Sequence, residues 1–387
     1  MSKFRFLTSG ESHGKCLNAI IEGLPAGFKI DEDFINNELK RRQTGYGRGK
    51  RMQIESDRCE IKSGVRFGLT TGAPVCIEVK NKDFENWKIA MSSSPVDMSD
   101  EEIAKLVNDK SFTKVRPGHA DYAGAVKYGF DDLRNVLERS SARQTAIEVA
   151  VGAIAKLILK EFSIEGFSHV TQIGCVKASD LPDNYSDIAQ FAEESEVRCA
   201  DKNVSELMKK EIDNAKEQGD TLGGKFEVVF ENLPVGIGSF VHWDRKLDGK
   251  IAQAVMSIPA IKSVEIGAGV EAAELMGSKM HDEIFCENDK IYRKTNNAGG
   301  IEGGMSNGEA IVVKAVMKAI PTMRTPLKTV DYKTLEQTEA HFERSDSCAV
   351  PACAVVAEAR VACVLLEAFL EKFGGDSLSE IKKIYEK

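Results

Sequence analysis

The chain has 387 residues, of which 42% are apolar and 29% are charged, a composition typical of proteins that fold around a core. Lysine and arginine number 52 and aspartate and glutamate 60, so the net charge of −8 argues against general binding to nucleic acids or anionic membranes. No segment approaches the roughly 18 consecutive apolar residues of a membrane span, and the N-terminus has no signal-peptide core, so we expect a cytoplasmic protein without a membrane partner.

Sheet-like and helical patterns alternate along the chain without a repeat or a low-complexity linker, which predicts one domain over residues 1–387. The strongest strand patterns, rich in β-branched and aromatic residues, cover residues 4–7, 17–21, 75–79, 226–230 and 310–316. The polar, irregular stretch 86–113 is expected to be a surface excursion that contains a short helix.

Three long helices are predicted from their end signals: one from Asp31 to about Arg42, one from a capping box at 141–144 to about residue 160, and one from Pro351 to Gly374. The last two are apolar around nearly their whole circumference. Such helices belong inside a large fold or an oligomer. The sequence therefore predicts an α+β architecture in which helices are covered by sheet on more than one side, rather than a doubly wound one.

Nine cysteines form no Cys-x-x-Cys pair, and their odd number suits no complete disulfide framework. We expect free, mostly buried thiols. Cys348 and Cys353 have no histidine at ligand spacing, so no metal site is predicted.

The first cluster with chemical character is Gly10-Glu11-Ser12-His13-Gly14, which follows the first predicted strand. Its glycines permit a tight turn, and an imidazole exchanges protons near neutral pH. On spacing alone, a histidine that only bonds to the turn backbone is the better explanation of the pattern.

The segment from Lys40 to Arg51 holds six basic residues, three glycines and no acid. It suits a solvated charged surface, an RNA-contacting loop, or a loop that folds over a small phosphorylated ligand. A P-loop is excluded because the Gly-Lys-Ser/Thr ending is missing.

Two further segments combine turn formers with donors. Arg116-Pro117-Gly118-His119-Ala120-Asp121 places a histidine in a rigid turn, and the segment 138–145, Glu-Arg-Ser-Ser-Ala-Arg-Gln-Thr, opens a predicted helix. A helix start with two hydroxyls and two arginines is suited to bind an anion. Simple turn formation and N-capping by Ser141 account for the same residues without a ligand.

Later in the chain, the segment 252–259 and the glycine-rich stretch 297–308 resemble loops that lie against a planar ligand, and the segment 318–322 follows them. Their spacing does not fit a Rossmann nucleotide site. Asp346 precedes the last long helix, where it suits either an N-cap or a functional carboxylate.

Taken together, these segments resemble the chorismate synthase family. The resemblance runs from Gly10 to about Glu358 and rests on three separated signatures, at 10–14, at 138–143, and at 344–346 with Glu358 following, supported by the segment 116–121. It implies a β-α-β sandwich with long helices packed between antiparallel sheets, assembled as a homotetramer. It also implies a 1,4-anti elimination of phosphate from 5-enolpyruvylshikimate 3-phosphate (EPSP), with reduced FMN as cofactor and no net redox change.

The resemblance also implies roles for individual residues. The substrate arginines of the family correspond to Arg42, Arg48, Arg116, Arg143 and Arg344. The flavin contacts correspond to Arg139, Ser140, Ser141, Gln253, Ala254, Gly303, Lys318, Ala319, Ile320, Pro321, Thr322 and Arg344.

Three residues correspond to the family's catalytic groups. His13 matches the histidine that protonates the departing phosphate, His119 the one that faces the reduced flavin near N1, and Asp346 the carboxylate that helps flavin N5 accept the substrate proton. Gln144 stands where the family usually has glutamate, a change that keeps the capping geometry and removes a charge.

Two other classes of function compete with this one. A non-catalytic anion- or RNA-binding protein would use the segment from Lys40 to Arg51 and would need neither His13 nor His119. A flavin reductase would need a nicotinamide site, for which the sequence has no fingerprint. We therefore expect a monofunctional enzyme supplied with reduced FMN by a separate flavin reductase or another source.

Overall fold

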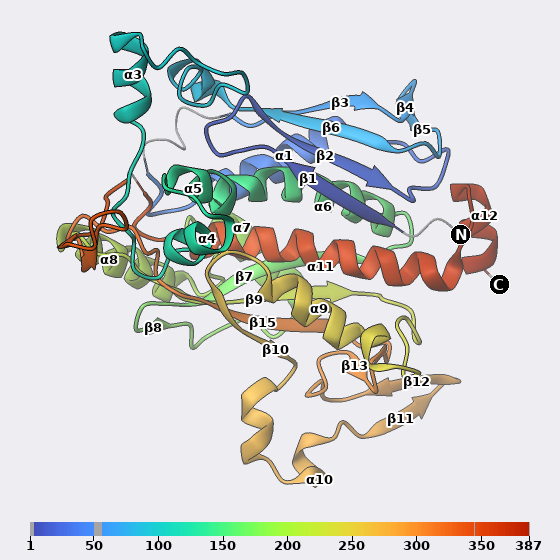
Figure 1. Cartoon of the computed structure of the whole chain (residues 1–387). Helices are drawn as coiled ribbons and strands as arrows, with labels where there is room; N and C mark the ends of the chain where they lie inside the picture. Colours follow the sequence, from blue (N-terminus) through green and yellow to red (C-terminus); the bar gives the residue numbers. More distant parts are fainter. Residues whose placement is uncertain (1–3, 50–55, 344, 387) are drawn as a thin grey trace.

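The computed structural model describes residues 4–49, 56–343 and 345–386. Two antiparallel sheets enclose a layer of long helices (Figure 1). The first sheet has the strand order β1 (Arg5–Ser9), β2 (Cys16–Glu22), β6 (Val75–Lys80) and β3 (Cys59–Ser63). The second has the order β10 (Ile261–Ile266), β15 (Ile311–Met317), β9 (Gly224–Glu231), β7 (Glu165–Ile173) and β8 (Val176–Lys177). The predicted β-α-β sandwich is confirmed.

The helix layer contains α1 (Glu32–Gln43), α6 (Thr145–Lys160) and α11 (Val350–Phe373), and α9 (Leu247–Met256) packs beside α11. Helix α6 contacts β2 and β6 of the first sheet, whereas α11 contacts β7 and β9 of the second. Both helices are therefore buried around most of their circumference, as their apolar sequences predict.

The predicted ends of two helices agree with the structure. Asp31 caps α1 by accepting a hydrogen bond from the backbone N–H of Phe34 at 3.0 Å. Helix α11 has Pro351 in its first turn and ends before Gly374. Gly152 lets α6 and α11 approach closely, because a Cβ there would lie 2.3 Å from that of Ala359.

The start of α6 differs from the prediction. Helix α5 (Arg134–Ser140) ends at Ser141, whose backbone is extended, and a 3₁₀ turn, η2 (Ala142–Gln144), precedes α6. Ser141 accepts a hydrogen bond from the N–H of Arg143, so it caps the 3₁₀ turn rather than the long helix. The predicted capping box is therefore wrong, and two helices meet at a bend instead.

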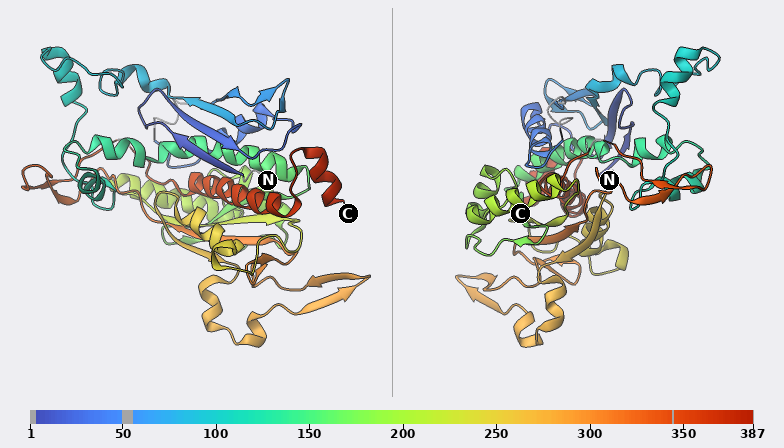
Figure 2. Two further views of the ribbon diagram at one scale, coloured as in Figure 1. Left: turned by 45° about the vertical axis from the view of Figure 1, so that its right-hand side comes forward. Right: turned by 90° about the vertical axis from the view of Figure 1, so that its left-hand side faces the viewer.

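Smaller elements decorate the sandwich. The excursion 86–113 follows the 3₁₀ helix η1 (Lys82–Asn86) and carries the predicted short helix, α3 (Glu101–Asn108), which projects from the layers (Figure 2). The hairpin of β11 (Ile284–Glu287) and β12 (Lys290–Arg293) also projects from the layers (Figure 2). The remaining helices are α4 (Asp121–Tyr128), α7 (Tyr185–Glu194), α8 (Lys202–Glu217), α10 (Gly277–Met280) and α12 (Leu378–Tyr385), with η3 (Trp243–Arg245) and η4 (Gly269–Glu274). Short hairpins pair β4 (Val65–Arg66) with β5 (Leu69–Thr70), β13 (Ile301–Glu302) with β14 (Met305–Ser306), and β16 (Lys328–Val330) with β17 (Gln337–Glu339).

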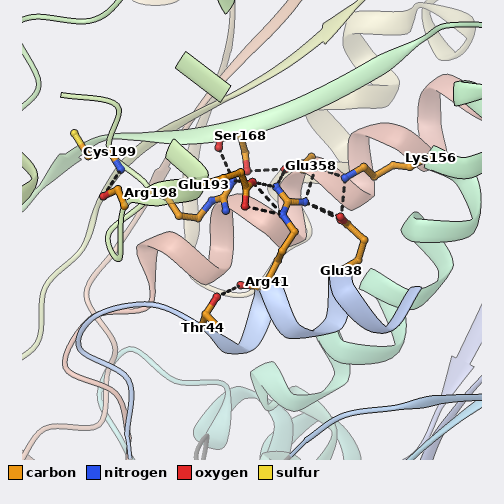
Figure 3. Close-up of polar contacts among 10 residues, drawn as sticks. Glu38, Arg41, Thr44, Lys156, Ser168, Glu193, Arg198, Cys199 and Glu358 are labelled. Atoms are coloured by element: carbon orange, nitrogen blue, oxygen red, sulfur yellow. Dashed lines mark hydrogen bonds and ion pairs between the residues drawn. The ribbon is translucent and has the colours of Figure 1, made fainter. Parts of the chain in front are cut away.

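A cluster of six charged side chains joins the helix layer to β7 and extends from the fully buried Glu358 to Glu193, whose side chain is 42% exposed (Figure 3). Glu358 of α11 is fully buried and accepts hydrogen bonds from Arg41 of α1, Lys156 of α6 and Ser168 of β7. Glu38 and Glu193 complete the pairing of Arg41, and Glu193 also accepts from Arg198. Because every charge has a partner of opposite sign, the cluster links the helices and β7 at one point of the core.

All nine cysteines are free thiols, and five of them are buried: Cys59, Cys199, Cys348, Cys353 and Cys363. Burial raises the pKa of the Cys59 thiol to about 12, so these side chains behave as small apolar groups. No helix in the described ranges is long and apolar enough to cross a membrane.

Candidate active site

A cavity of about 2070 Å³ opens where α6 and α11 begin and α1 ends. Its walls bring together segments that lie far apart along the chain. The predicted residues that line it are His13, Arg42, Arg48, Arg116, His119, Ser140, Ser141, Arg143, Lys318, Ile320, Pro321, Thr322 and Asp346. Thus all three predicted catalytic residues and every predicted substrate arginine within the described ranges face one space.

His13 is held in the wall by a buried carboxylate. Glu138 of α5 accepts a hydrogen bond from the His13 backbone N–H at 2.7 Å, and its other oxygen lies 2.8 Å from His13 Nδ1. The imidazole stacks on the Trp87 indole with ring centroids 3.9 Å apart. His13 therefore has a fixed ring plane, and it does more than bond to the turn backbone.

His119 is held in the same manner in the turn before α4. Its Nδ1 lies 2.6 Å from Asp121, a fully buried carboxylate that also accepts two hydrogen bonds of 2.8 Å from the Arg116 guanidinium. Although burial raises the pKa of Asp121, the hydrogen bonds from Arg116 and His119 lower it to about 2. Asp121 is therefore a carboxylate at any physiological pH.

Two of the predicted substrate arginines share one acidic partner. Arg143 donates to Asp57 at 2.7 Å and to Asn81 at 2.8 Å, and Arg42 Nη1 lies 3.8 Å from Asp57. Burial, reinforced by the neighbouring cations Arg143 and Arg48, lowers the pKa of Arg42 to about 10. The Arg42 guanidinium bonds Thr145 and the carbonyl of Ala142, but its Nη1 is buried and has no hydrogen-bond partner. That nitrogen is a donor in need of an acceptor.

Asp346 joins the basic segment to the last helix. One of its oxygens lies 2.6 Å from Arg48 Nη1, and the other accepts a hydrogen bond from the Gly49 N–H at 2.6 Å. The N-cap position of α11 is occupied by Ala349, so Asp346 does not cap that helix. Gly47 has φ +85°, and a Cβ there would lie 2.9 Å from Ile212, so glycine permits this loop to pack as it does.

The described arginines of the basic segment face inward rather than forming a solvated surface. Arg42 is buried, the Arg41 side chain is 19% exposed in the buried charge cluster, and that of Arg48 is 11% exposed. Residues 50–55, which include Lys50 and Arg51, lie outside the described residues. This arrangement suits a small ligand inside the protein better than an extended polyanion.

Several predicted flavin contacts do not face the large cavity. Arg139 and Ala254 line a second cavity of about 470 Å³ beside β1, where the Arg139 guanidinium donates to the Thr8 hydroxyl at 2.8 Å. Gln253, Gly303 and Ala319 line neither cavity. Arg344 lies outside the described residues.

The sequence analysis missed four polar or aromatic residues of the site: Asp57, Trp87, Asp121 and Glu138. Glu138 and Asp121 stand inside segments that were singled out, and a buried acid beside arginine and histidine could have been assigned as a partner. Trp87 is 9% exposed although it lies in the stretch expected to be a surface excursion. No pattern in the sequence pointed to Asp57 or Trp87, because their partners are distant along the chain.

The described residues contain no group of three or more histidine, cysteine, aspartate or glutamate side chains arranged to hold a metal ion. The polar groups that line the cavity include guanidinium groups, two imidazoles, hydroxyls and four lysine ammonium groups, together with carboxylates such as that of Asp346. Such a lining is suited to bind anionic organic ligands and to donate protons to them.

Comparisons with known proteins agree with this interpretation. The family model described as "Chorismate synthase" matches residues 4–370. The chain is 54% identical to the chorismate synthase of Alkaliphilus metalliredigens (strain QYMF), over 99% of this chain and 98% of the relative. It is 53% identical to the chorismate synthase of Carboxydothermus hydrogenoformans, over 99% of this chain and 97% of that relative. It resembles a solved structure titled "Crystal Structure of Chorismate Synthase" with a TM-score of 0.78 and 42% identity, over 99% and 96% of the two chains. With the layered fold, the three signatures and a cavity lined by their residues, these matches establish that the chain belongs to the chorismate synthase family.

Proposed function

We propose that the large cavity binds EPSP together with reduced FMN and eliminates phosphate from EPSP in a 1,4-anti reaction that gives chorismate with no net redox change. One observation carries the proposal. Two histidines, each fixed by a carboxylate, and four arginines from separate parts of the chain line the same cavity of about 2070 Å³. That volume exceeds the roughly 300–1,000 Å³ of a site for one small molecule, which suits a substrate and a flavin bound side by side.

The arginines fit the charge of the substrate. EPSP carries two carboxylates and a phosphate, and a chain with a net charge of −8 must concentrate cations locally to bind it. Arg48 and Arg143 line the cavity, with Arg143 anchored by Asp57 and Asn81, and Arg42 adds a buried Nη1 with no hydrogen-bond partner. Arg116 is engaged with Asp121 and His119, so its contribution to binding is through charge and through the position of His119.

One wall of the cavity fits a flavin. Ile320 and Pro321 supply apolar surface, while Lys318, Thr322, Ser140 and Ser141 supply donors suited to ring carbonyls or a phosphate. Lys318 also donates to the carbonyl of Gly118, which connects this wall to the His119 turn. When bound, reduced FMN supplies the electron-rich ring on which the family's elimination depends. Arg139, Gln253, Ala254, Gly303, Ala319 and Arg344 stay predictions as flavin contacts.

The two histidines are proposed to divide the proton transfers. His13 donates a proton to the departing phosphate, and His119 holds a proton toward the flavin wall. Asp346 keeps Arg48 and the Gly49 backbone in place beside them. General acid catalysis of this kind contributes about 10²- to 10⁴-fold to a rate.

Anaerobic turnover of EPSP tests the proposal. We expect activity with chemically reduced FMN and none with oxidised FMN plus NADPH, because the sequence has no nicotinamide fingerprint. Phosphate release without any flavin would contradict the cofactor assignment. Robust NADPH-driven turnover by the purified chain would contradict a monofunctional enzyme supplied by a separate reductase.

Three further features are proposed from the family alone. We expect a homotetramer, four times the 42.4 kDa mass of the chain, which sedimentation equilibrium measures directly. We expect a cytoplasmic location and no nucleic-acid partner. A polyanion affinity with a steep salt dependence would favour the RNA-binding alternative instead.

A further inference from the structure

The two cavity histidines share one arrangement that the family signatures do not describe. In each, Nδ1 faces a buried carboxylate, at 2.8 Å for His13 and Glu138 and at 2.6 Å for His119 and Asp121. Glu138 is 4% exposed and Asp121 is fully buried. The pairs come from different segments and use different acids, so the shared geometry does not follow from one local motif.

Each carboxylate is itself held by the turn that carries the histidine and by an arginine. Glu138 accepts from the His13 backbone N–H at 2.7 Å and lies 3.5 Å from Arg134. Asp121 accepts from the Arg116 backbone N–H at 3.2 Å and from two nitrogens of its guanidinium at 2.8 Å. In each case the arginine places a positive charge beside a carboxylate that is buried.

This geometry selects which ring nitrogen carries the proton when an imidazole is neutral. A carboxylate only accepts hydrogen bonds, and an unprotonated Nδ1 at 2.6–2.8 Å from it would set two lone pairs against each other. Arg116 Nη2 also lies 3.0 Å from His119 Nδ1 and 3.4 Å from its Nε2, but the shorter contact with Asp121 requires the proton on Nδ1, which leaves Nε2 as the acceptor toward Arg116 or a ligand. Nε2 is then the nitrogen that exchanges a proton with a ligand.

We propose that Glu138 and Asp121 are positioning residues that fix His13 and His119 with Nδ1 protonated, so that Nε2 serves as the exchangeable site in both proton transfers. The inference rests on the proposed function of the two histidines. It adds the acids that set their tautomer and ring plane, and it explains why a glutamate opens the second signature segment, 138–143.

Two of the other histidine–carboxylate contacts among the described residues differ in ways that make them controls, whereas a third, between His341 and Glu343 at 3.4 Å, involves a carboxylate that also pairs with Arg134. His242 and Asp244 pair at 2.7 Å, but both side chains are more than half exposed. His169 is 1% exposed and pairs through Nε2 with Glu227 at 3.2 Å, on strands β7 and β9 and away from either cavity. Glu227→Gln therefore makes the same chemical change at a buried histidine that has no role in the reaction.

The first test observes the ring nitrogens directly. Nitrogen-15 spectra of the full chain labelled at its six histidines distinguish a protonated Nδ1 from a bare one, and His13→Ala and His119→Ala assign the signals. We expect Nδ1 of both residues to be protonated at all pH values at which the protein is folded. A bare Nδ1 on either neutral ring would overturn the inference for that histidine.

The second test compares kinetics. Glutamine at 138 keeps the size of the side chain but sets an amide donor against either the His13 N–H or its Nδ1–H. We expect Glu138→Gln to lower kcat about 10- to 1000-fold with KM changed less than about threefold, because the lost tautomer control acts on proton transfer rather than on binding. Glu138→Asp should recover part of the rate, and Glu227→Gln should keep the wild-type rate while shifting only the His169 signal.

The outcomes distinguish the proposed function of the histidines from the positioning role of the carboxylates. If His13→Ala leaves turnover intact, the proposed function of His13 fails. If His13→Ala abolishes turnover while Glu138→Gln keeps kcat and the Nδ1 proton signal, the function stands and the positioning role is overturned. For His119 the readout is the nitrogen-15 signal in Asp121→Asn, because freeing Arg116 also changes substrate binding. A His119 signal unchanged by Asp121→Asn counts against the role of Asp121.

Discussion

Removing the charge of Glu358 should destabilise the protein strongly, although the residue does not line the large cavity. Its oxygens accept four hydrogen bonds: Oε1 from Arg41 Nη1 and Lys156, and Oε2 from Arg41 Nη2 and Ser168. Glutamine in place of Glu358 keeps one accepting oxygen, so two of the four bonds are lost. Each hydrogen bond that involves a charged group contributes about 1.5–3 kcal/mol, so the loss of two should lower the free energy of unfolding by at least about 3 kcal/mol.

The charge balance of the cluster predicts a similar loss in the free energy of unfolding. Glu38, Glu193 and Glu358 face Arg41, Lys156 and Arg198, so Glu358→Gln leaves one positive charge without compensation inside the core. Removing one partner from a buried ion pair costs about 3–5 kcal/mol. We therefore expect the free energy of unfolding to fall by about 3–5 kcal/mol.

Urea denaturation followed by circular dichroism, at one fixed protein concentration, measures the change. The matched control is Glu22→Gln, which breaks the 2.6 Å pair between Arg5 and Glu22, whose side chains are 75% and 44% exposed. That control should cost no more than about 1 kcal/mol. The double variant Lys156→Met/Glu358→Gln restores neutrality and should be more stable than Glu358→Gln alone. A loss below about 1 kcal/mol for Glu358→Gln, or simple additivity in the double variant, would refute the reasoning.

The same carboxylate predicts a pH dependence. Burial by itself raises the pKa of Glu358, but Arg41 and Lys156 outweigh it and lower the pKa well below the ordinary value of 4.5. A carboxyl group whose pKa is depressed by folding stabilises the folded state above its unfolded pKa, and this contribution is lost as the pH falls below it. The melting temperature of the wild type should therefore drop between about pH 4.5 and 2 more steeply than that of Glu358→Gln. Parallel curves would contradict an ionised Glu358.

The remaining predictions concern the cavity. His13→Ala and His119→Ala should each keep fold and ligand binding and lose about 10- to 1000-fold in turnover, and only His119→Ala should alter the spectrum of bound reduced FMN in anaerobic stopped-flow measurements. Identical flavin spectra for the wild type and both variants would contradict this division of roles. Arg48→Ala and Arg344→Ala should weaken EPSP binding by about 1.5–3 kcal/mol without lowering the melting temperature, as titration calorimetry and thermal melting would measure. Unchanged affinity in both would mean that these arginines do not bind the substrate.

Much of the fold is determined locally and was predicted from the sequence. The cap at Asp31, the proline at 351 and the glycine at 374 set the ends of two helices within one or two residues, because capping depends on side chains adjacent to the helix end. The all-round apolar surface of the helices at 145–160 and 350–373 required cover on more than one side, and the sandwich supplies it. The signature residues, matched to a known family, identified the two histidines, Asp346 and four arginines of the cavity lining, whereas most of the other lining residues were not predicted.

Tertiary structure decided which charges meet. His13 and Glu138 are 125 positions apart, Gly49 and Asp346 are 297 apart, and Arg41 and Glu358 are 317 apart, so no spacing rule links them. Tertiary structure also determined that the chain bends at Ser141 between two helices, that the Asp346 carboxylate pairs with Arg48 instead of capping a helix, and that Trp87 stacks on His13. The physical reason is that backbone preferences and apolar periodicity act over a few residues, whereas a buried charge finds its counter-ion only when the layers pack together.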